Sequence, residues 1–90
     1  MNFEGKEFTA YSIPTTNTAV LIIGAEKGFL GCGYINIDMA NRVNDVCAIV
    51  TGVKNPDDML SAKVVAASKA AAQLGIKEGI SGKEALLLMS

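Results

Sequence analysis

Residues 18–35 read TAVLIIGAEKGFLGCGYI, and this stretch decides the fold class. Residues 18–23 are apolar at nearly every position, which predicts a strand that is buried on both faces. Residues 26–28 (EKG) predict a three-residue hairpin loop, with Gly28 in the left-handed position of a bulge. The following strand over residues 29–35 also has apolar side chains on both faces. The stretch therefore predicts an antiparallel hairpin with two apolar sides.

Strand signals continue on both sides of this hairpin. Residues 7–13 predict an earlier strand that ends at Pro14, so that three strands form an antiparallel meander. On the other side, Asn36 is placed to cap a short helix over residues 37–43. A further apolar strand is predicted over residues 46–50.

A long helix is predicted to begin at Asn55, with Pro56 in its first turn. Its predicted stop is Gly75, which is typical of a left-handed helix C-terminus. Apolar residues recur between these points at helical spacing: Leu60, Val64, Ala67, Ala71 and Leu74. Ser81 and Glu84 form a capping box that predicts a last helix.

The predicted order is β-β-β-α-β-α-α, an α+β fold with a mixed four-stranded sheet. One long helix and two short ones can cover one face of this sheet but hardly both. Because the strands are apolar on both faces, the uncovered face is expected to pack on a second copy of the chain. We therefore expect a homo-oligomer, either a dimer or a tetramer.

Composition limits the classes of partner. The 90 residues form one domain, residues 1–90, and eight basic residues against nine acidic ones form no basic stripe for nucleic acid. No apolar run is long enough to span a bilayer. Two cysteines without a disulfide pattern fit a reducing compartment, so a cytoplasmic protein is expected. No cofactor is expected.

The chain has no histidine, which excludes Ser-His and Cys-His activation within one chain and any His-containing metal site. No metal site is expected. The strand–helix–strand unit around residues 36–45 could be a parallel crossover. In that case residues 32–36 and residues 51–55 meet at one edge of the sheet, under the N-termini of the two helices that follow them. That arrangement suits an anion or a polarised carbonyl. The candidate site residues are Cys32, Tyr34, Asn36, Thr51, Gly52 and Lys54.

Each candidate also has a purely structural interpretation, which we favour at most positions. Cys32 and Cys47 fit small buried apolar residues. Asn36 fits a helix cap, and Asp57 and Asp58 fit residues that complement a helix dipole. The segment 51–54 lacks the glycine spacing of a phosphate-binding loop.

Four motifs resemble the YunC-like family of bacteria and archaea, a domain of unknown function. They are Lys27-Gly28-x-x-x-Cys32-Gly33-Tyr34-x-Asn36, Ile49-Val50-x-Gly52-Val53, Asp57-Asp58-Met59-Leu60, and Leu74-Gly75-Ile76-x-x-Gly79-Ile80-Ser81-Gly82-Lys83-Glu84-Ala85-Leu86. The resemblance implies a β-rich N-terminal oligomerisation region, about residues 3–35, that forms a tetramer. An α/β region of about residues 36–90 follows. The resemblance implies no activity and no catalytic residues.

Three functions remain open from the sequence. We favour a non-enzymatic homo-oligomer that binds a small molecule or a protein. The second is a thiol-dependent enzyme centred on Cys32, assisted by Lys54 and helix N-termini. The third is a purely structural assembly protein.

Overall fold

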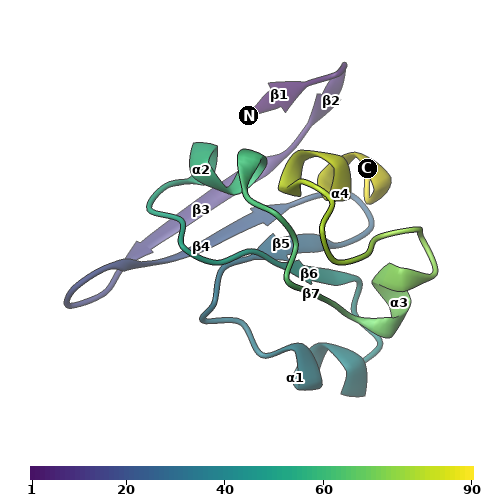
Figure 1. Cartoon of the computed structure of the whole chain (residues 1–90). Coiled ribbons are helices and arrows are strands. Elements are labelled where there is room, and N and C mark those ends of the chain that lie inside the picture. Colours follow the sequence, from purple (N-terminus) through teal and green to yellow (C-terminus); the bar gives the residue numbers. More distant parts are fainter.

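The computed structural model describes all residues, 1–90, as one sheet with helices on both sides and a small hairpin at the N-terminus (Figure 1). The elements in chain order are β1 Asn2–Phe3, β2 Lys6–Glu7, β3 Thr9–Pro14, β4 Ala19–Gly24, β5 Phe29–Gly31, α1 Ile37–Arg42, β6 Cys47–Ile49, α2 Pro56–Ser61, β7 Ala66–Ala67, α3 Lys69–Ala72 and α4 Gly82–Leu88.

The sheet is mixed, which confirms the predicted α+β class. Its strand order is β3-β4-β5-β6-β7. Strands β3, β4 and β5 form the predicted antiparallel meander, and β5 pairs with β6 in parallel. The sheet has five strands rather than the predicted four, because β7 adds to β6 antiparallel. The β1–β2 hairpin, which the sequence did not predict, lies outside this sheet.

One face of the sheet is sealed over β4 and β5 by α2 and α4, which lie together above it in Figure 1. Leu21, Ile23 and Leu30 point into this side and are at most 1% exposed. Leu86 of α4 and Met59 of α2 meet them there and are fully buried. This face therefore holds the main core of the molecule.

Helix α1 lies on the opposite face, so the prediction that all helices share one face was wrong. Ala40 of α1 packs in a second, smaller cluster with Cys47 and Ile49 of β6. Phe29 of β5 lies partly buried against the same cluster. Because α1 follows β5 directly and leads into β6, it can cover only the strands that it connects. The β5–β6 half of this face is covered, and the β3–β4 half is not.

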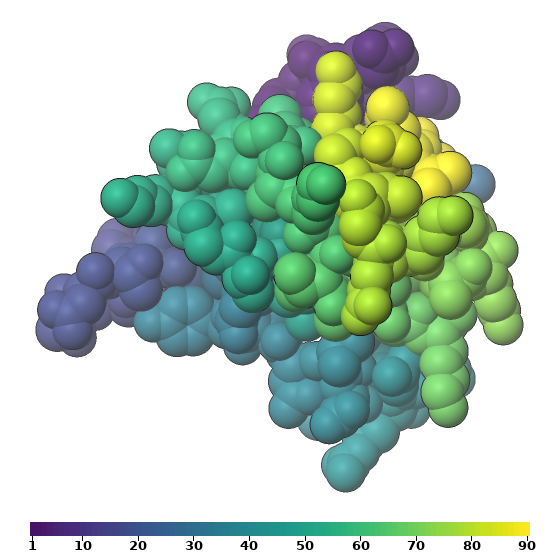
Figure 2. All heavy atoms as spheres, viewed as in Figure 1, coloured from purple at the N-terminus to yellow at the C-terminus, as the bar shows by residue number.

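The uncovered half presents apolar side chains to solvent. The register pairs Tyr11 with Ile22 and Ile13 with Val20 across β3 and β4, so these four side chains share the face opposite Leu21. Tyr11 is 53% exposed and Ile13 is 58% exposed. We call these four residues, Tyr11, Ile13, Val20 and Ile22, the open face. The turn that joins β3 to β4 projects from the body at the left of Figure 2.

The long helix predicted from Asn55 to Gly75 was wrong. Helix α2 ends at Ser61, and its C-cap Ala62 has an extended ψ of 153°. The chain then runs extended through β7 before α3, which Ser68 caps through its side chain. The predicted helix is therefore two short helices separated by an edge strand.

The physical reason for this difference is the free edge of β6. The backbone N–H of Val65 donates to the carbonyl of Ile49 at 2.8 Å, and that of Ser68 donates to Cys47 at 2.8 Å. An extended segment satisfies these β6 carbonyls, which a helix could not do. The predicted apolar residues still face the main core, where Val64 and Ala71 are buried. Two of the five residues predicted on the apolar face, Val64 and Ala71, are buried, and the other three, Leu60, Ala67 and Leu74, are partly buried. Periodicity thus predicted the inward-facing positions but not their secondary structure.

Several local predictions are confirmed. Asn36 caps α1, and its Oδ1 accepts hydrogen bonds from the N–H groups of Asp38 and Met39 at 2.8 and 3.3 Å. Ser81 caps α4, where its Oγ accepts from the N–H of Glu84 at 3.1 Å. Gly75 has the predicted left-handed backbone, with φ of 88°.

The hairpin between β4 and β5 is also confirmed, but the role predicted for Gly28 was wrong. Gly28 does not have a positive φ, so it forms no left-handed bulge. A Cβ at this position would instead collide with the carbonyl oxygen of Val46. Close approach of the chain that leads into β6 is therefore the reason for glycine here.

None of the four helices has the length and apolar character needed to cross a membrane.

Candidate functional site

The parallel pairing of β5 and β6 produces the juxtaposition that the sequence predicted. Phe29 lies opposite Cys47 and Gly31 opposite Ile49, so both strands end at the same edge of the sheet. The chain continues from β5 into Cys32 and from β6 into Thr51. Residues about twenty positions apart in the sequence are therefore neighbours at this edge.

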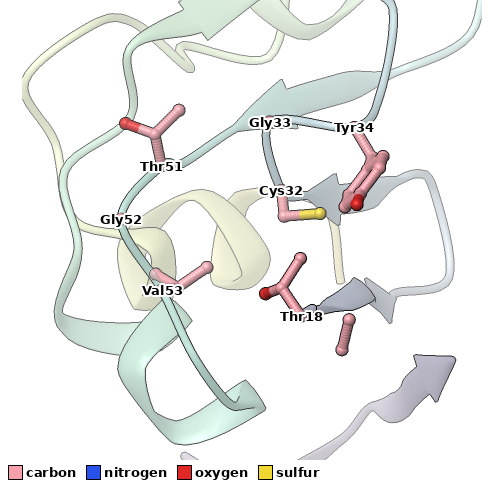
Figure 3. A pocket seen from close by; sticks show the side chains of 8 residues that line it. Thr18, Cys32, Gly33, Tyr34, Thr51, Gly52 and Val53 are labelled. Carbon is pink, nitrogen blue, oxygen red and sulfur yellow. The ribbon is translucent and has the colours of Figure 1, made fainter. Parts of the chain in front are cut away.

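A cleft of about 250 Å³ opens at this edge (Figure 3). Three segments line it: the start of β4, the loop after β5 and the loop after β6. The lining residues are Thr18, Ala19, Cys32, Gly33, Tyr34, Thr51, Gly52 and Val53. No lysine, arginine, aspartate or glutamate is among them. The cleft offers a thiol, hydroxyl groups, glycine backbone and aliphatic surface.

Cys32 forms the buried part of the cleft and is 5% exposed. Its backbone N–H donates to the carbonyl of Leu21 at 3.1 Å, which extends the β4–β5 ladder by one residue. The N–H of Leu21 in turn donates to Cys32 Sγ at 3.3 Å. The thiol is thus held between the main core and the cleft.

Tyr34 stands at the cleft wall and is 56% exposed. Its hydroxyl donates to Thr15 Oγ1 at 3.4 Å, in the turn between β3 and β4. The contact is long and exposed, so it contributes little to stability. It nevertheless joins the loop after β5 to the projecting turn on the far side of the cleft.

Two predicted site residues lie outside the cleft lining. Asn36 is engaged as the cap of α1, and Lys54 is exposed. The N–H of Lys54 donates to Asp58 Oδ2 at 3.0 Å, while Asn55 Oδ1 accepts from the N–H of Asp58 at 2.8 Å. Amides in the first turn of both short helices, those of Asp38 and Met39 in α1 and of Asp58 in α2, therefore already have partners. This supports the structural interpretation of Asn36, Asn55 and Asp58 over an anion site.

Four predicted residues meet in the cleft, and four others were missed. Cys32, Tyr34, Thr51 and Gly52 line it, as the crossover hypothesis required. The missed lining residues are Thr18, Ala19, Gly33 and Val53. Gly33 and Val53 are chain neighbours of predicted residues. Ala19 begins β4 and Thr18 precedes it, and the predicted hairpin places the start of β4 beside the residues that follow β5.

Cys47 contrasts with Cys32 because it lies in the covered part of the sheet. Its side chain is fully buried in the cluster under α1. Burial raises the pKa of this thiol to about 11, and the nearby charge of Asp45 adds to the shift. The thiolate is the nucleophilic form, so Cys47 is inert near neutral pH. This agrees with its interpretation as a small apolar residue.

Comparison with known proteins places the chain among uncharacterised relatives. A family model described as a domain of unknown function, DUF1805, matches residues 31–89. The chain is 34% identical over 90 residues to the uncharacterised protein YunC of Bacillus subtilis, covering 96% of this chain and 89% of YunC.

A solved structure shares the fold. The crystal structure of TA1206, a protein of unknown function from Thermoplasma acidophilum, superposes with a TM-score of 0.80 at 34% identity, covering 100% of both chains. The fold described above is therefore that of an experimentally determined relative. On the family match and on the similarity to YunC, this chain belongs to the DUF1805 family, a YunC-like domain of unknown function.

Proposed function

We propose that the protein is a self-associating, non-enzymatic module that binds a small molecule in the cleft beside Cys32. The observation that carries the proposal is the position of the cleft at the carboxyl ends of β5 and β6, the parallel pair of the sheet. Ligands of open sheets with parallel strands bind outside the carboxyl ends of those strands. The glycines of the two loops leave backbone accessible to a ligand.

The cleft lining favours binding over catalysis. General acid–base chemistry needs a group that titrates near the working pH within hydrogen-bond reach of the reactants. The lining has hydroxyl groups and one thiol but no carboxylate, imidazole or amine. Lys54, the charged residue that the enzyme hypothesis uses, does not line the cleft.

Self-association is proposed through the open face. Strand β3 lies at the edge of the sheet, carries no charged residue and is exposed at every position. Such an edge with exposed Tyr11 and Ile13 is a template for pairing unless another chain covers it. A second copy of the chain is the occupant that we propose.

Binding in the cleft is tested by titrating the full chain with a fragment library and following backbone amide resonances by NMR. We expect fragments to shift the resonances of Gly33, Thr51 and Gly52 together. Shifts scattered over the surface, or no shift at these three amides, would contradict binding in the cleft.

A thiol-dependent enzyme is the second candidate, because the Cys32 thiol is directed at the cleft. Iodoacetamide alkylation followed by mass spectrometry tests it, with Cys47 as the buried reference in the same chain. Modification of Cys32 in the native protein at or above the rate of a free thiol would support an enzyme. Modification of both cysteines only after denaturation would remove this candidate.

A further inference from the structure

No charged side chain lines the cleft to neutralise a charged ligand. Among the helix amides that could attract an anion, those of Asp38 and Met39 in α1 donate to Asn36, and that of Asp58 in α2 donates to Asn55. The groups that would attract a cation are missing, because no carboxylate lines the cleft. A charged group that gives up its hydration without an opposite charge is strongly disfavoured. The cleft lining therefore disfavours both anionic and cationic ligands.

The size and the chemistry of the walls limit the ligand further. A closed apolar cavity of about 150 Å³ accommodates benzene, whereas this cleft measures about 250 Å³. Ala19 and Val53 supply aliphatic surface, and the hydroxyl groups of Thr18 and Tyr34 supply hydrogen-bonding capacity at the walls. The space thus fits one ring with a short polar substituent.

From this lining we infer that the cleft takes an uncharged, single-ring molecule that bears a hydroxyl or carbonyl group. The ring packs on the aliphatic lining of the cleft, to which Ala19 and Val53 contribute, and the polar substituent meets the hydroxyl groups of the walls. This inference rests on the proposed function, since it specifies the ligand class of the same cleft.

Three probes of nearly equal shape and different charge test the inference: benzyl alcohol, benzoate and benzylammonium. Each is titrated into the full chain at pH 7, with the amide resonances of Gly33, Thr51 and Gly52 as the readout. We expect benzyl alcohol to shift these resonances and both charged probes to bind at least about tenfold more weakly. Equal or tighter binding of either charged probe would overturn the ligand class and leave the proposed function standing.

Absence of any benzyl alcohol shift at the cleft would also overturn the inference. The fragment titration then decides separately on the proposed function. Hits of other chemistry at Gly33, Thr51 and Gly52 would preserve the function, and no hits there would remove it as well.

A matched pair of glycine variants checks that the probe occupies the cleft. A Cβ at Gly33 would lie 3.6 Å from Thr51 Cγ2, an ordinary contact, so Gly33→Ala is compatible with the fold and narrows the cleft. Gly24→Ala adds the same methyl away from the cleft, with its nearest neighbours at 3.8 Å. We expect Gly33→Ala to weaken benzyl alcohol binding about tenfold and Gly24→Ala to leave it unchanged. Unchanged binding to Gly33→Ala would overturn the inference.

Discussion

The two faces of the sheet differ in how completely the chain covers them. The face toward α2 and α4 is sealed over β4 and β5, and Leu30 and Leu86 on that side are fully buried. The opposite face is covered by α1 over β5 and β6 only, which leaves Tyr11 and Ile13 more than half exposed. Both faces are built from equally apolar strands. Strand composition therefore does not determine burial; the path of the connecting helices does.

The sequence predicted that one face of the sheet would be entirely uncovered, whereas α1 covers half of that face. Phe29 lies in the covered half, partly buried against the cluster under α1, whereas Ile13 lies in the open half. A substitution at Phe29 would mix loss of stability with loss of association. Ile13 separates the two effects because its side chain has few intramolecular contacts to lose.

The largest effect is expected on the sealed face. Leu86→Ala should lower the free energy of unfolding by about 3 kcal/mol, because it leaves a cavity in the main core. Urea unfolding followed by circular dichroism measures this value. Leu88→Ala, on the same helix but 42% exposed, should cost less than about 1 kcal/mol. Equal losses for the two variants would show that the sealed face is not the main core.

The next effect is expected on the open half. Ile13→Glu places a charge in the proposed interface and should weaken self-association about 100-fold, or about 2.7 kcal/mol. Light scattering over a concentration series measures the oligomer. Ser12→Glu, with the same charge on the opposite side of β3, is the control and should associate nearly as the unmodified chain does. A single-chain mass for the unmodified protein, or an Ile13→Glu oligomer of unchanged affinity, would refute the open face as an interface.

The smallest of these effects concerns the half covered by α1. A thiol ordinarily has a pKa of 9.0, whereas burial in the folded protein raises the pKa of Cys47 to about 11. Above pH 9 the folded state therefore binds more protons than the unfolded state, and raising the pH favours unfolding. The contribution is fully present below about pH 9 and is lost as the pH rises through 11, a decrease of about 2 kcal/mol by pH 11.

Denaturant unfolding at pH 8, 9, 10 and 11 measures this decrease. Cys47→Ala removes the thiol, so its stability should fall less steeply over the same range, and the difference between the two curves isolates Cys47. Parallel curves would mean that the Cys47 thiol ionises freely in the folded protein and that α1 does not seal it.

Local signals in the sequence predicted much of the crossover region. Asn36 and Ser81 cap helices as expected, because a cap needs only its own side chain and amides two or three residues ahead. The meeting of Cys32 with Thr51 also followed from local elements once β5 and β6 were taken as parallel.

The segment after α2 could not be predicted in the same way. Val64 and Ala71 occupy positions that suit a helix as well as an inward-facing extended chain. The choice between them depends on hydrogen bonds to Ile49 and Cys47, which are distant in the sequence. Thr18 and Ala19 were missed in the cleft for a different reason, since the predicted β4–β5 hairpin already places the start of β4 beside the residues that follow β5.

The sequence by itself determined where the capped helices begin and that the strands are apolar on both sides. These properties depend on side-chain chemistry and on contacts within a few residues. Only the tertiary structure decided that residues 66–67 form a strand, that α1 covers half of a face and that the start of β4 and the loops after β5 and β6 line a cleft. Those outcomes depend on backbone groups of one strand finding partners far along the chain, and no local pattern encodes that pairing.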